Sequence, residues 1–64
     1  MTTRHEFSSY VNGDRRADVI KLNGLWGCVF YAEGKEIKQE LYKGHNEMWA
    51  ENAAENYVLG IKKI

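Results

Sequence analysis

Proline is absent from the 64 residues, cysteine occurs once, and neither sign of charge is in excess, since nine Lys and Arg balance nine Asp and Glu. The single Cys28 excludes an internal disulfide and suits a reducing cytosol. A net charge of zero argues against a strongly basic nucleic-acid binder and equally against an acidic disordered tail. What is present, a hydrophobic content of 44%, is enough for a small globular domain.

Long apolar runs are also missing. None approaches the roughly 18 residues of a membrane span, and Met1–Tyr10 has no apolar signal-peptide segment. We therefore expect a cytoplasmic protein with no membrane partner. A chain of 64 residues is one domain, buries only about 60% of the surface that it exposes when unfolded, and is expected to reach a stability of roughly 3–5 kcal/mol.

The clearest local signal is Asn23-Gly24, which lies between the strand-like segments Asp18–Leu22 and Leu25–Tyr31. Asn-Gly supplies the positive φ angles of a two-residue type I′ turn, so the pattern predicts a β-hairpin. Glu33-Gly34 predicts a second turn, which leads into Glu36–Tyr42. Three antiparallel strands result.

Two-residue turns fix the register and therefore the two faces of the sheet. Leu22 is expected opposite Leu25 and Val19 opposite Cys28, and in the next pair of strands Phe30 opposite Ile37 and Trp26 opposite Leu41. The predicted core face carries Val19, Trp26, Cys28, Phe30, Ile37 and Leu41, with Lys21 and Gln39 between them. The other face carries Ile20, Leu22, Leu25, Val29, Tyr31 and Tyr42, mixed with Glu36, Lys38 and Glu40.

A helix is predicted from Asn46, a plausible N-cap, to Gly60, a natural C-terminal stop. At 100° per residue it has one broad apolar arc formed by Trp49, Ala50, Ala53, Ala54, Tyr57 and Val58. A separate acidic stripe is formed by Glu47, Glu51 and Glu55. Three alanines on the arc allow the helix to lie close to the sheet.

The fold expected for residues 17–64 is therefore α+β, with a three-stranded antiparallel sheet packed on one C-terminal helix. Residues 1–16 are either a fourth strand or an arm outside the sheet. Alternation around Phe7 and Val11 and the turn signal Asn12-Gly13 are compatible with the strand, and the sequence leaves both readings equally open.

No catalytic or metal-binding pattern is present, so we expect neither an enzyme nor a cofactor. His5 and His45 with Cys28 do not make the four ligands of a zinc site at any recognised spacing. Cys28 lies on the predicted core face, where cysteine is usually an inert buried side chain. The acidic stripe is most simply a solvated helix face.

Two nucleic-acid-binding families share this order of elements. Val29–Ile37 followed by the helix Ala50–Leu59 resembles the end of the double-stranded-RNA-binding domain, but Glu47 and Glu51 stand where that family carries lysines, so its phosphate-binding residues are not carried over. Gly24-Leu-Trp26, Glu33-Gly-Lys35 and Ala53-Ala54 resemble AP2-like and integrase arm-type DNA-binding domains. That resemblance implies a sheet that enters a DNA groove.

Trp49–Ile61 is also similar to small uncharacterised proteins of tailed phages that infect marine bacteria, which implies the cytoplasm of an infected cell. One helix covers one face of a sheet, so the other face would be open to a partner. The preferred hypothesis is a non-enzymatic module that binds a host or phage protein, or a second copy of itself. The expected contact residues are Ile20, Leu22, Leu25, Val29, Tyr31 and Tyr42.

Two alternatives remain. The first is nucleic-acid binding through the sheet, with phosphate contacts from Arg15, Arg16, Lys21, Lys35 and Lys38. The second is mimicry of a phosphate row by the acidic stripe, which the zero net charge disfavours.

Overall fold

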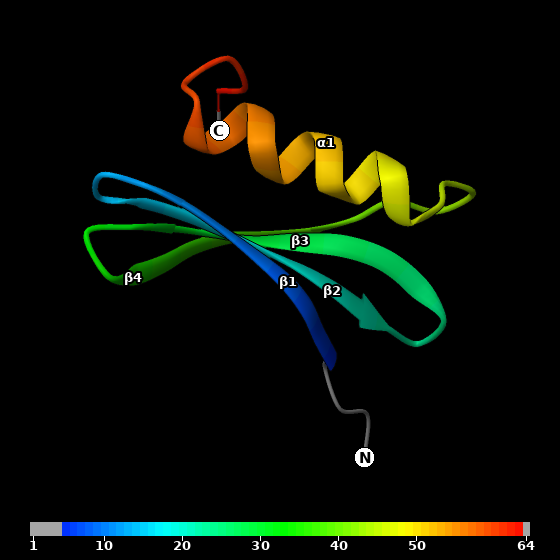
Figure 1. Ribbon diagram of the computed structural model, residues 1–64. Coiled ribbons are helices and arrows are strands. Elements are labelled where there is room, and N and C mark those ends of the chain that lie inside the picture. Colours follow the sequence, from blue (N-terminus) through cyan, green and yellow to red (C-terminus); the bar gives the residue numbers. More distant parts are fainter. Residues whose placement is uncertain (1–4, 64) are drawn as a thin grey trace.

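The computed structural model describes residues 5–63. Four antiparallel strands form one sheet in the order β1-β2-β3-β4, and one helix lies across a face of that sheet (Figure 1). The elements are β1 (His5–Asn12), β2 (Arg15–Leu22), β3 (Leu25–Ala32), β4 (Lys35–Leu41) and α1 (Glu47–Val58). The α+β fold is confirmed. Of the two readings of the N-terminal segment, the strand is right for His5–Asn12, and residues 1–4 lie outside the described residues.

The turns form where the sequence predicts them. Asn23 and Gly24 have φ angles of 54° and 76°, and Glu33 and Gly34 have φ angles of 53° and 79°. Two successive positive φ values are what a type I′ hairpin requires, and Asn and Gly adopt them with the least strain. The register between β2 and β3 follows from the first turn, with Leu22 opposite Leu25 as expected.

The predicted register between β3 and β4 is wrong beyond the turn. Ile37 forms a β-bulge, so that Phe30 pairs with Lys38 and Gly27 pairs with Leu41. An extra residue in one strand moves every later side chain of that strand to the opposite face. Ile37 and Leu41, expected in the core, are therefore 51% and 37% exposed.

The bulge also brings Lys38, Glu40 and Tyr42 to the side of α1, because the directly paired residues of two strands share a face. Tyr42 packs against the core below the helix, so its predicted place on the face away from the helix is wrong.

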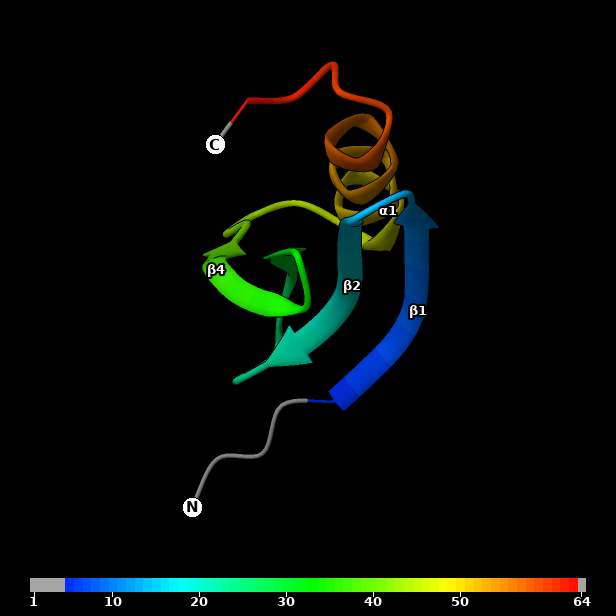
Figure 2. The ribbon, with the colours of Figure 1, turned by 90° about the vertical axis from the view of Figure 1, so that its left-hand side faces the viewer.

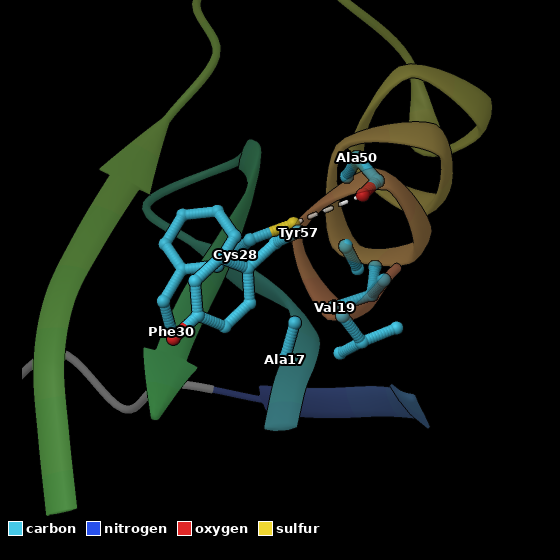
Figure 3. Packing of buried hydrophobic residues seen from close by; sticks show 8 residues of the cluster. Ala17, Val19, Cys28, Phe30, Ala50 and Tyr57 are labelled. Carbon is cyan, nitrogen blue, oxygen red and sulfur yellow. Dashed lines mark hydrogen bonds between the residues drawn. The ribbon is translucent and has the colours of Figure 1, made fainter. Parts of the chain in front are cut away.

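The core lies between α1 and the middle of the sheet (Figure 3). The Phe30 and Tyr57 rings meet edge to face with centroids 4.9 Å apart, and the Cys28 thiol donates a hydrogen bond of 2.9 Å to the Ala50 carbonyl oxygen. The buried residues of this core are Ala17, Val19, Cys28, Phe30, Ala50, Ala54, Tyr57 and Val58. Trp26 and Ala53 pack at its margin. Trp49, expected in the buried arc, is instead 51% exposed.

Both ends of α1 are held by specific hydrogen bonds. The Asn46 side chain accepts one from the Trp49 amide at 3.2 Å, which confirms the predicted N-cap. At the other end Gly60 has a φ of 86°, and the amide of Ile61 donates to the Asn56 carbonyl at 2.8 Å. This is a Schellman motif, and it turns the following residues back along the helix.

The hairpin between β1 and β2 secures the C-terminal end of α1. The Asn12 side-chain amide donates to the Val58 carbonyl at 2.9 Å, and the Arg15 guanidinium donates to the Tyr57 carbonyl at 3.2 Å. These donors satisfy carbonyl groups that a helix end leaves without intrahelical partners. They fix α1 over β1, β2 and β3.

Candidate functional site

The sheet face away from α1 is less open than the sequence suggests. Ile20 and Val29 have no exposed surface, although they point away from the helix, and Leu22, Leu25 and Tyr31 are half-buried. The strands bend strongly, as β1 and β2 show in Figure 2, so that this side of the sheet is concave. The expectation of a broad apolar face open to solvent is therefore wrong for Ile20 and Val29.

Gly27 allows this curvature. A Cβ at Gly27 would clash with the Glu40 carbonyl oxygen and the Leu41 side chain. Leu41 thus lies over Gly27 on the concave side, where only a glycine permits β4 to come so close. The same residue pair explains why Leu41 is absent from the core below the helix.

A polar cluster occupies the other part of the concave side. Asp18 is fully buried and accepts two hydrogen bonds of 2.9 Å from the Arg16 guanidinium and one of 2.7 Å from the Ser9 hydroxyl. The guanidinium carbon lies 4.9 Å from the centroid of the Tyr31 ring. Because the buried carboxylate has a bidentate partner and a hydroxyl donor, this cluster is a structural ion pair.

The five cations of the nucleic-acid hypothesis do not line one surface. Arg16 lies on the concave side, whereas Arg15 contacts the end of α1 and Lys21 lies 5.0 Å from the Trp26 ring. Lys38 forms an ion pair of 3.4 Å with Glu40, and Lys35 is exposed at the start of β4. Nucleic-acid binding stays a prediction that these contacts do not strengthen.

A concavity lies on the other side of the sheet, between α1 and β4. Because α1 packs on β1, β2 and β3, it leaves the helix side of β4 uncovered (Figure 2). The resulting space, which we call the α1–β4 groove, has a volume of about 850 Å³. It is lined by Glu40, Leu41, Tyr42, His45, Trp49, Asn52, Ala53, Asn56, Ile61 and Lys62.

Trp49 and Ile61 provide the exposed apolar surface of the groove. Trp49 is 51% exposed, and its ring stacks on His45 with centroids 4.0 Å apart and an interplanar angle of 11°. Ile61 is 68% exposed and is held in place by the Schellman hydrogen bond to Asn56. Asn52 lies between them along the helix, so the wall alternates apolar and amide groups.

A polar network is centred on Glu40, which lines the groove together with Tyr42 and Lys62. Glu40 accepts a hydrogen bond of 2.8 Å from the Tyr42 hydroxyl and forms ion pairs with Lys62 at 3.3 Å and Lys38 at 3.4 Å. Burial alone would raise the pKa of Glu40, but the hydrogen bonds from Tyr42 and Lys62 outweigh it and lower this pKa. Burial, followed by the hydrogen bond to Glu40, raises the pKa of Tyr42. Glu40 is therefore ionised and Tyr42 neutral at pH 7.

Cys28 is unsuited to chemistry. It is fully buried, and burial raises the pKa of its thiol from 9.0 to about 11. A thiol in that state is protonated at neutral pH and is a poor nucleophile and metal ligand. Within residues 5–63, no three His, Cys, Asp or Glu side chains lie close enough to hold a metal ion.

The sequence did not predict the groove, although several of its residues were assigned to other positions in the fold. Tyr42 and Glu40 were assigned to the wrong face by the bulge at Ile37, and Trp49 was assigned to the core. The signal that could have located the groove is the Gly60 stop, since a Schellman turn brings Ile61 and Lys62 back to the helix.

No protein-family model, curated protein or solved structure matches the chain. In the described part of the chain, α1 is too short and too polar to cross a membrane.

Proposed function

We propose that this protein is a non-enzymatic binding module that takes an extended segment of another protein into the α1–β4 groove. The observation that carries the proposal is the half-exposed Trp49 indole beside a concave space of about 850 Å³. Tryptophan is enriched among the residues that dominate binding energy at protein interfaces, and it usually acts as an anchor beside a pocket.

The dimensions of the groove favour an extended segment. Trp49 and Asn56 are seven residues apart, which is about 10 Å along a helix, so the groove spans about three residues of an extended chain. β4 borders it as one of the two edge strands among residues 5–63. Edge strands and amide side chains both offer hydrogen bonds to the backbone of an incoming segment.

This proposal keeps the protein-binding role expected from the sequence and moves it from the concave sheet face to the groove. Within the same proposal, the similarity of Trp49–Ile61 to small tailed-phage proteins favours a bacterial host protein as the partner and the host cytoplasm as the location.

The test is a titration of the ¹⁵N-labelled protein with an array of acetylated, amidated hexapeptides, each with one Leu, Phe or Trp. We expect a subset to bind with a Kd below about 1 mM and to shift the resonances of the Trp49 indole and the Asn52 side-chain amide. Trp49→Ala should weaken that binding by tenfold or more, as about 1.4 kcal/mol or more from a central anchor implies.

Leu59→Ala is the matched control, because Leu59 is 56% exposed at the C-terminal end of the same helix but does not line the groove. It should bind these peptides as the parent does. If no peptide shifts the groove resonances, or if both variants lose binding equally, the proposal is wrong. Shifts that depend on protein concentration alone would identify a second copy of the chain as the occupant.

A further inference from the structure

The α1–β4 groove has an uneven distribution of charge. A single carboxylate on its lining, Glu40, pairs with the ammonium groups of Lys62, which also lines the groove, and of Lys38, which lies beside it. Glu40 also accepts a hydrogen bond from the Tyr42 hydroxyl, and the Glu40 side chain is only 23% exposed. The side chains of Lys38 and Lys62 are 48% and 30% exposed. An incoming group therefore meets the cations more readily than the anion.

The Glu40 cluster carries one positive charge in excess, since Lys62, which lines the groove, and Lys38, which lies beside it, both pair with one ionised carboxylate. An ammonium carries three donors, and one ion pair with Glu40 does not use all of them. The acidic stripe does not cancel this excess. At 100° per residue, Glu47, Glu51 and Glu55 lie on the face of α1 turned away from Trp49, Asn52 and Asn56, which line the groove.

The position of Lys62 is fixed by the backbone. Its amide donates to the Asn56 carbonyl at 3.0 Å, and its ammonium lies 5.9 Å from the centroid of the Phe30 ring. The neighbouring Ile61 side chain contributes the apolar border at the same end of the groove. One end of the groove thus combines an apolar border with a held cation.

From this juxtaposition we infer that the segment bound in the groove carries an internal acidic residue within about three positions of a large apolar side chain. The apolar side chain contacts Trp49 or Ile61, and the carboxylate accepts a hydrogen bond from Lys62. The limit of three positions follows from the groove length of about 10 Å and a rise of about 3.3 Å per extended residue. This inference rests on the proposed function and specifies its partner.

The experiment uses the amidated hexapeptides that bind the parent protein. In each, one residue at a distance of one to five positions from the apolar residue is replaced by Glu, and a matching peptide carries Gln at the same position. Glu peptides with the short spacings should bind about fivefold tighter than their Gln forms, the upper end for a partly exposed ion pair. The preference should weaken at 0.5 M salt, because such a pair is screened, and it should vanish at the longest spacings.

Two variants test whether Lys62 is the cation that binds the acidic residue. Lys62→Met keeps the aliphatic stem and should abolish the preference for Glu over Gln. Lys63→Met removes the next charge in the chain, which does not line the groove, and should leave the preference intact. Thermal melts of both variants show whether each remains folded.

Equal binding of the Glu and Gln forms to the parent, or an equal loss of preference in both variants, would overturn the inference and leave the proposed function standing. A gain in affinity that is confined to peptides with a free C-terminal carboxylate would also overturn the inference, because the groove would then bind a chain end. Absence of any peptide binding would instead contradict the proposed function itself.

Discussion

Phe30 is the largest fully buried side chain among residues 5–63; its ring meets Tyr57 edge to face and lies 5.9 Å from the Lys62 ammonium. Truncation of a buried Phe to Ala costs about 3–5 kcal/mol, which is roughly all the stability that so small a domain has. We therefore expect Phe30→Ala to be largely unfolded, as measured by circular dichroism in a denaturant series. Leu22→Ala, on the half-buried concave side, should lose less than about 1.5 kcal/mol.

If Leu22→Ala proves as unstable as Phe30→Ala, the concave side is a second core that contributes as much to stability as the core below α1. Tyr42→Ala cannot serve as the mild control that the predicted register suggests, because Tyr42 packs on the helix side and binds Glu40.

The fate of individual residues shows how far the sequence can lead. Cys28 and Phe30 were assigned to the core because Asn23-Gly24 fixes the register of their strand, and both are fully buried. Tyr42 was misplaced because one extra residue, Ile37, enters β4. A bulge of this kind leaves no signal in the alternation of Lys35–Leu41, where charged residues lie on both faces.

At the scale of the element, α1 depends on its first turn. The Asn46 side chain satisfies the Trp49 amide, one of the donors that a helix start leaves without a partner. We expect Asn46→Ala to lower the free energy of unfolding by about 1 kcal/mol, with a matching fall in Tm. Asn46→Asp should retain most of the stability, because a carboxylate also caps and suits the helix dipole.

Equal destabilisation by Ala and Asp would show that the cap does not support the helix. Because the Asn46 side chain holds the Trp49 amide, Asn46→Ala should also weaken peptide binding in the groove.

The ends of α1 could be predicted, whereas its position over the sheet could not. Asn46 and Gly60 mark its ends in the sequence. The apolar arc, however, does not specify which strands it covers. α1 is drawn toward β1 and β2 by the hydrogen bonds of Asn12 and Arg15 to its last carbonyl groups, which are contacts over more than 40 residues of sequence. That offset exposes Trp49 and creates the groove.

At the scale of the molecule, a strongly bent sheet and an off-centre helix divide the surface into distinct sides. The concave side is filled by Ile20, Val29 and the Asp18 ion pair, and the helix side carries the open α1–β4 groove. Curvature and offset arise from Gly27, the bulges and long-range hydrogen bonds acting together. Local patterns therefore predicted the three later strands and the helix, but not the bulge and the offset of α1 that form the groove.

The stability of the whole molecule should fall at alkaline pH. Burial raises the pKa of the Cys28 thiol to about 11, from an ordinary value of 9.0. Above pH 9 the unfolded chain loses this proton while the folded chain keeps it, so the unfolded state binds fewer protons and stability decreases as pH rises from about 9 to 11. A pKa difference of about two units corresponds to a loss of roughly 2–3 kcal/mol across this range. Tyr42, whose pKa is also raised by burial, adds to the loss above pH 10.

Cys28→Ser isolates the thiol, because serine offers a hydroxyl to the Ala50 carbonyl and does not titrate in this range. Urea unfolding at half-unit steps from pH 7 to 10.5 should give a steeper decline for the parent than for Cys28→Ser. The largest causes of the raised pKa of Tyr42, burial and the hydrogen bond to Glu40, are common to both proteins. The two proteins should differ little in slope below pH 8.5, where the thiol is protonated in both states of the parent. Parallel curves up to pH 10.5 would mean that Cys28 titrates alike in the folded and unfolded chains, and that water reaches the core beneath α1.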